Sequence, residues 1–151
     1  MHKLLVAIMI GVASSTSSAR TANESPPLEP SLLKNGHEIY RQYCGSCHGA
    51  NAQGAPHWQE RDEHGELPAP PHNIEGHTWR HSDAELYMMV SKGWRDPFNK
   101  TERLTMPAFG DVLSPDQIRA VIAYLKTLWT PEEIRFQLEE SRGHPFPSAG
   151  E

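Results

Sequence analysis

The chain holds only two cysteines, and they stand close together in front of a histidine, in the order Cys44-Gly45-Ser46-Cys47-His48. Two thiols separated by two residues and followed directly by an imidazole are the pattern of covalent c-type haem attachment. Each thiol adds to one of the two vinyl groups on one edge of the porphyrin, and the histidine that follows is directed to the iron. The pattern therefore predicts one haem c, with Cys44 and Cys47 as its covalent attachments and His48 as an iron ligand.

Other chemistries for the same cysteine pair are weaker. A disulfide between Cys44 and Cys47 closes almost no loop and would add little stability. A thioredoxin-like redox pair belongs in a βαβ setting, and no strand pattern surrounds this motif. A zinc site needs two further ligands, and the chain has no second cysteine pair, although its histidines leave zinc open as an alternative.

Met106 is the residue that we expect to bind the iron on the side opposite His48. Its thioether is a soft ligand, and a Met/His pair raises the potential of a c-type haem. Pro107 keeps Met106 out of helical geometry, so the side chain is presented from an extended segment. The alternatives are that Met106 fills the core or that a loop histidine takes its place. The candidate histidines are His57, His64, His72, His77 and His81, of which the last three could also form a second metal site.

Helical patterns flank the chemistry-bearing residues. Apolar residues at spacings of three and four predict a helix over 32–43, with Ser31 as its N-cap and its end near Cys44 and Gly45. Capping signals and periodicity predict further helices over 82–92 and 114–128. Met88 and Met89 belong to the first of these and are expected in the core. No strand alternation is present, and the segments 49–78 and 94–105 are expected as loops.

These features together resemble the class I, monohaem cytochrome c family, over Leu33 to Trp129. The resemblance implies an all-α fold, with three main helices around one covalently attached haem and long loops. It also implies single-electron transfer rather than catalysis. The residues that carry it are Gly36 and Tyr40 in the first helix, Cys44, Cys47 and His48, the segment Met106-Pro107-Ala108-Phe109, and 114–128 with Tyr124.

The resemblance also implies contacts around the haem. A proline carbonyl is expected to accept a hydrogen bond from the second ring nitrogen of His48, with Pro71 as the first candidate and Pro70 as the second. Trp79 and Arg80 are expected as donors to the haem propionates. The alternative is that Trp79 packs on the haem edge and Arg80 is solvated.

The N-terminal residues 1–19 have the features of a secretory signal peptide. Lys3 precedes an apolar run from Leu4 to Ala13, and small residues lead to an expected cleavage after Ala19. The run has 10 residues, and a membrane-spanning helix needs about 20. An uncleaved anchor is the alternative. We therefore expect an exported chain, periplasmic in a bacterium, with no membrane span after cleavage.

The rest of the chain divides into a linker over 20–31, a cytochrome c domain over 32–129 and a C-terminal extension over 130–151. The extension is expected to be helical to Ser141 and disordered from Arg142 onward. The net charge of −5 argues against a nucleic-acid partner. It favours redox protein partners with basic docking patches.

Three functions follow from this organisation. The main expectation is a soluble, exported carrier of single electrons between redox partners. One alternative is a haem peroxidase or a gas-binding sensor with a labile sixth ligand. The other is a cytochrome subunit of a larger respiratory or dehydrogenase complex, in which the extension over 130–151 could act as a docking arm.

Overall fold

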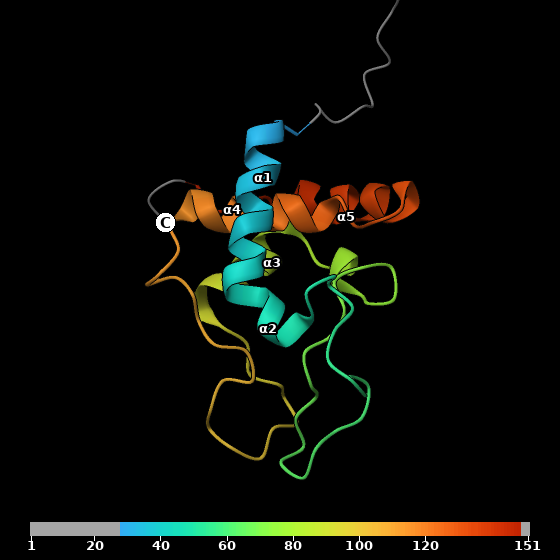
Figure 1. Ribbon diagram of the computed structural model, residues 1–151, viewed down its shortest axis with the longest axis vertical. Coiled ribbons are helices and arrows are strands. Elements are labelled where there is room, and N and C mark those ends of the chain that lie inside the picture. The colour runs from blue at the N-terminus through green and yellow to red at the C-terminus, as the bar shows by residue number, and fades with distance from the viewer. Residues whose placement is uncertain (1–27, 149–151) are drawn as a thin grey trace, which may run out of the picture.

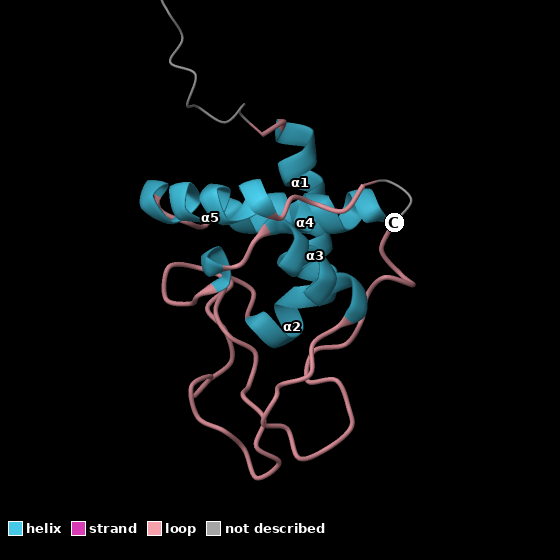
Figure 2. Ribbon diagram, turned by 180° about the vertical axis from the view of Figure 1, so that it is seen from behind, coloured by secondary structure: helices cyan, strands magenta, loops and turns pink. Residues whose placement is uncertain are grey.

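The computed structural model describes residues 28–148, so the predicted signal peptide and its cleavage point lie outside the described residues. Within that range the regular structure is helical, and strand pairing is limited to an isolated antiparallel bridge between Trp94 and Met106 (Figure 2). The all-α fold is therefore confirmed. The elements are α1 (Pro30–Ile39), the π-helical turn η1 (Tyr40–Cys44), α2 (Gly45–His48), the 3-10 turn η2 (Thr78–Arg80), α3 (Asp83–Lys92), α4 (Pro115–Lys126) and α5 (Pro131–Gly143).

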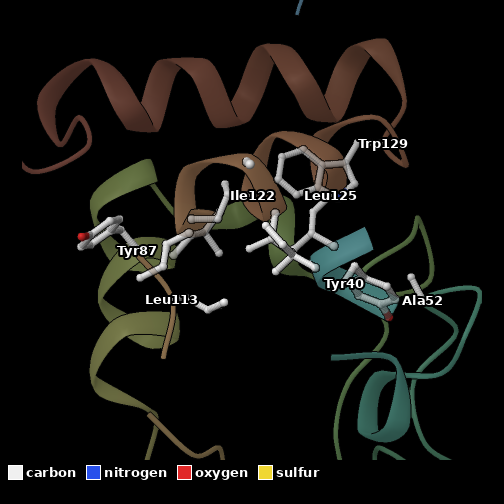
Figure 3. Close-up of a cluster of buried hydrophobic side chains, with 12 residues drawn as sticks. Tyr40, Ala52, Tyr87, Leu113, Ile122, Leu125 and Trp129 are labelled. Carbon is white, nitrogen blue, oxygen red and sulfur yellow. The ribbon is translucent and has the colours of Figure 1, made fainter. Parts of the chain in front are cut away.

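The core forms where α1 crosses α4 (Figure 1). The apolar stripe of α4 is fully buried, as its periodicity predicts, and Figure 3 shows Ile122 and Leu125 of this stripe gathered with Tyr40 and Trp129. Gly36 lies at the crossing, where a Cβ atom would come within 2.9 Å of the Tyr124 Cβ. The core residues are Ile39, Tyr40, Ala52, Leu86, Tyr87, Leu113, Ile118, Ala120, Val121, Ile122, Leu125 and Trp129.

Helix starts follow the sequence signals at three of four long helices. Capping boxes join Ser82 with Glu85 at α3, Ser114 with Gln117 at α4 and Thr130 with Glu133 at α5. At α1 the expected start was wrong. This helix begins at Pro30 rather than at Leu32, and its N-cap is Glu29 rather than Ser31. The first helical position suits proline, because its missing N–H would have no partner there.

The first helical region also runs further than its sequence pattern indicates. Instead of ending near Cys44 and Gly45, it continues through η1 and α2 as far as His48. The Gly45 N–H donates to the Tyr40 carbonyl, and Gly45 itself has helical dihedrals. The chain leaves the helix at Gly49, whose φ of +82° favours glycine. The haem-attachment motif is therefore helical throughout.

The C-terminal extension is a fourth long helix that packs back onto the domain. Gln137 of α5 is fully buried and donates from Nε2 to Asp83 Oδ1 at 2.7 Å and to Ser141 Oγ at 2.8 Å. Beyond α5, the Pro147 carbonyl accepts a bond from Arg119 at 2.6 Å. The expected disorder from Arg142 onward is therefore wrong for residues 142–148, while 149–151 lie outside the described residues.

The two long loops lie side by side at the end of the molecule away from α4 and α5 (Figure 1). Arg61 pairs with the buried carboxylate of Asp96 at 2.8 Å, and Arg103 pairs with the buried carboxylate of Glu66. These two ion pairs cross-link the loops because each joins one residue of the first loop to one of the second. None of the helices in residues 28–148 has the length and apolar character needed to cross a bilayer.

Candidate haem site

His48 is held at one ring nitrogen and unpaired at the other. Its ring is buried, and Nδ1 lies 2.8 Å from the Pro70 carbonyl oxygen. Because a carbonyl can only accept, Nδ1 carries the proton. Among residues 28–148 the Nε2 atom makes no hydrogen bond, which leaves it available to a metal. Burial lowers the pKa of His48 against the opposing effect of the Pro70 bond, and this favours the neutral imidazole that an iron ligand must be.

The carbonyl beside His48 belongs to Pro70, so Pro71, the first candidate, is wrong in that role. Backbone bonds from Ala55 N to Ala69 O and from His72 N to Ala52 O fix the register of this segment. The Pro71 carbonyl instead accepts from the Thr78 hydroxyl at 3.4 Å.

A second histidine lies against His48. The His72 ring stacks on the His48 ring with 4.0 Å between centroids and 28° between planes. Burial, followed by the neighbouring His48 and His77, lowers the pKa of His72 well below its ordinary value. The sequence grouped His72 with His77 and His81 as a possible second metal site and did not predict its contact with His48.

The two thiols are free and differ in exposure. Cys44 is partly buried at the end of η1, and Cys47 is exposed in α2. Burial, with a smaller effect of Cys47, raises the pKa of Cys44 to about 11. The helical course of the motif places both cysteines and His48 within one turn and a half, because a helix advances 3.6 residues per turn.

Met106 is fixed through its backbone. Its N–H donates to the Trp94 carbonyl at 2.9 Å, and its own carbonyl accepts from the Trp94 N–H at 3.0 Å. Gly93 has a φ of +76° and lies so close that a Cβ there would be 2.7 Å from the Met106 carbonyl. The segment is therefore tied to the end of α3. The Met106 side chain is partly buried.

Trp79 presents an unsatisfied donor. Its Nε1 is buried and lacks a hydrogen-bond partner within residues 28–148. Its ring meets the Phe136 ring edge to face at 5.3 Å, and the Arg80 guanidinium lies 4.9 Å above it. Buried donors are rarely left unpaired in folded proteins. A carboxylate such as a haem propionate would satisfy Trp79. Arg80 is exposed and contacts Trp79 in the same region.

The remaining candidates do not form a second metal site. His77 contacts Trp58 and His81 through its ring, but no group of three metal-binding side chains suitable for a metal exists between residues 28 and 148. Met88 is 47% exposed, so its expected core position is wrong. With Met89, it lines an open pocket at the end of α3 beside the Met106 segment.

The donor set fits a c-type haem. It includes two free thiols, an imidazole with an unpaired Nε2, and an unpaired buried indole N–H. Fold and site thus define a helical protein with one haem-attachment motif. The family model for cytochrome c matches residues 33–129, and the chain belongs to the cytochrome c family. Members of this family carry covalent haem c with iron, and residues 33–129 are the part of the chain that the match assigns to this cofactor.

Two curated relatives are similar to this chain. It is 27% identical over 105 residues to the cbb3-type cytochrome c oxidase subunit FixP of Sinorhizobium medicae (strain WSM419), a match covering 69% of this chain and 32% of that protein. It is 28% identical over 118 residues to the subunit of the same name from Rhizobium meliloti (strain 1021), covering 78% and 36%. The chain therefore spans about a third of the length of these relatives.

Proposed function

We propose that this chain carries single electrons between redox proteins outside the cytoplasm, as a separate one-haem carrier. The observation that supports this proposal most strongly is the imidazole of His48, which is buried and unpaired at Nε2 and directly follows two free thiols. Cys44 and Cys47 would attach the haem, and His48 would bind its iron. When bound, haem supplies the one-electron Fe(III)/Fe(II) couple.

Met106 is the residue that would supply the second iron ligand. Its backbone bonds to Trp94 hold the segment at the end of α3, and Pro107 prevents it from becoming helical. The protein's contribution is to hold both ligands in place and to keep water from the iron. Trp79 is the proposed neutral hydrogen-bond donor to a propionate, and the Arg80 guanidinium beside it is the proposed second donor.

Export is the second part of the proposal. Residues 1–19 have the features of a signal peptide, and haem attachment through Cys44 and Cys47 would take place after export. In a bacterium the carrier would be periplasmic. Fractionation of the source cells tests this directly. We expect the haem-stained chain in the periplasmic fraction. Its mass should be that of a haem-bearing chain whose first residue is Arg20. A chain that retains Met1 and stays with the membrane would contradict cleavage.

A second candidate function is that of a haem subunit in a respiratory complex, and the relatives favour it because both are named as subunits of an oxidase. The extension packs onto its own domain through Gln137 and Phe136. This packing argues against a role of the extension as a docking arm. Native electrophoresis of source-cell extracts, stained for haem, separates the two functions. A carrier migrates as a single chain, lighter than the 17.0 kDa of the sequence that still holds residues 1–19, whereas a subunit comigrates with a complex of several chains.

A further inference from the structure

The His48 imidazole has two neighbours that restrain different motions. The Pro70 carbonyl accepts the hydrogen bond from Nδ1 at 2.8 Å, which fixes the direction in which that atom points. Hydrogen bonds tolerate a broad range of angles, so this bond alone leaves the tilt of the ring poorly defined. The His72 ring lies across one face of the His48 ring, with 4.0 Å between centroids. A ring in van der Waals contact resists tilting.

His72 is itself held from four sides. Its backbone N–H donates to the Ala52 carbonyl at 2.9 Å, and its carbonyl accepts from Trp129 Nε1 at 2.9 Å. Its Nδ1 lies 2.8 Å from the Thr78 hydroxyl, and its ring meets Tyr40 edge to face at 6.3 Å. Trp129 and Tyr40 both belong to the core. The stacked ring is therefore anchored to the hydrophobic core.

The Thr78 hydroxyl fixes the rotation of the His72 ring. A hydroxyl has one proton to donate, and the Thr78 proton goes to the Pro71 carbonyl at 3.4 Å. The hydroxyl oxygen is then the acceptor for a proton on His72 Nδ1. The ring plane of His72 is set by its own backbone at one end and by this bond at the other.

We propose that His72 is a positioning residue that sets the orientation of the His48 imidazole plane at the haem iron. The inference rests on the proposed role of His48 as an iron ligand. The plane of an axial imidazole decides which iron orbitals it overlaps, and so how unpaired spin is distributed over the porphyrin of a ferric haem. Groups around a metal ligand that fix its orientation also tune the metal.

The test compares haem-loaded, full-length variants by proton NMR of the ferric haem methyl groups and by redox titration. His72→Leu removes the flat ring, and His72→Phe keeps a flat ring without Nδ1. His64→Leu makes the leucine change at a half-exposed loop histidine and is the control. Thr78→Val removes the hydroxyl that holds His72 and provides a second route if His72→Leu does not accept haem.

For His72→Leu we expect a changed order or spread of the methyl resonances. We also expect a shift of about threefold to tenfold in the reduction equilibrium, about 30–60 mV for one electron. His72→Phe restores the wild-type methyl pattern, Thr78→Val changes it partly, and His64→Leu leaves it unchanged. The inference is overturned if His72→Leu has the methyl resonances and the reduction potential of the wild type. It is also overturned if the methyl resonances of Thr78→Val equal those of the wild type.

The wild-type spectrum separates this failure from failure of the proposed function. A wild-type ferric protein without the signature of histidine and methionine ligation overturns the proposed ligand set. If that signature is present and remains the same in every His72 variant, the ligand set stands and only the positioning role of His72 is refuted.

Discussion

Replacing Gly36 by alanine should destabilise the protein, although the same change inside a helix ordinarily stabilises it. Gly36 lies in α1 where this helix crosses α4. A Cβ atom on Gly36 would lie 2.8 Å from the carbonyl carbon of Ala120 and 2.9 Å from the Cβ of Tyr124. The atoms in the way are backbone and a first side-chain carbon, so no flexible side chain can move aside.

Two opposing contributions decide whether Gly36→Ala raises or lowers the free energy of unfolding. Alanine gains about 1 kcal/mol over glycine in a helix interior. Overpacking of a closely fitted core costs about 1–3 kcal/mol, and more where backbone must shift. Contacts of 2.8–2.9 Å lie well inside the ordinary range, so α1 and α4 must separate. We therefore expect a net loss of about 1–2 kcal/mol in the free energy of unfolding.

Denaturant unfolding of the haem-loaded protein measures this loss, and Gly143→Ala is the matched control. Gly143 ends α5, and a Cβ there would meet no atom within 4 Å. Gly143→Ala should be neutral or slightly stabilising. Stabilisation by Gly36→Ala as large as that by Gly143→Ala would refute this prediction. The gain in helix propensity would then exceed the cost of overpacking where α1 crosses α4.

Three further predictions concern a cap, a buried carboxylate and the unpaired indole. Ser114→Ala removes the acceptor for the Gln117 N–H at the start of α4 and should cost about 1 kcal/mol in unfolding free energy. Burial alone would raise the pKa of Asp96, but the Phe98 N–H and Arg61 outweigh it and hold that pKa below its usual value. This contribution to stability is present above the unfolded pKa of about 3.9 and is lost as the pH falls through the folded pKa. Asp96→Asn should therefore lower stability at pH 7, and the difference from wild type should shrink in acid; a constant difference would contradict the ion pair. Trp79→Phe removes the donor that we propose for a propionate and should lower the reduction potential, by up to about 59 mV, a tenfold change. An unchanged potential would contradict that role.

Local signals in the sequence predicted the helices that position the site. The apolar spacing of Ile118, Val121 and Leu125 identified the buried face of α4, since every residue of that face contributes independently to the pattern. The capping boxes identified the starts of α3 and α4 for the same reason, because their bonds join residues three apart.

The sequence did not reveal features that depend on contacts between distant segments. The choice between Pro70 and Pro71 depends on the backbone register set by Ala52 and Ala55 across a loop. The stacking of His72 on His48 follows from the same register. Packing of the tail likewise depends on Arg119, which lies far from it in the chain and bonds to the Pro147 carbonyl.

The helix over Thr130 to Gly143 is a further case in which the sequence predicted an element but not its contacts with distant segments. Its cap was readable from Thr130 and Glu133, so the helix itself was predicted. Its docking was not, because Gln137 is polar and gave no apolar signal. Gln137 is nonetheless fully buried, since Asp83 and Ser141 accept its amide protons.

The most direct test of the account is the visible absorption spectrum of the haem-loaded protein beside Met106→Ala. We expect sharp c-type bands on reduction and, in the ferric wild type, a weak near-red band from methionine bound to iron. Met106→Ala should lose the near-red band, and Met89→Leu, which changes a partly buried methionine of α3, should keep it. A near-red band that survives in Met106→Ala, or that is absent from the wild type, would contradict an electron carrier with His48 and Met106 as its iron ligands.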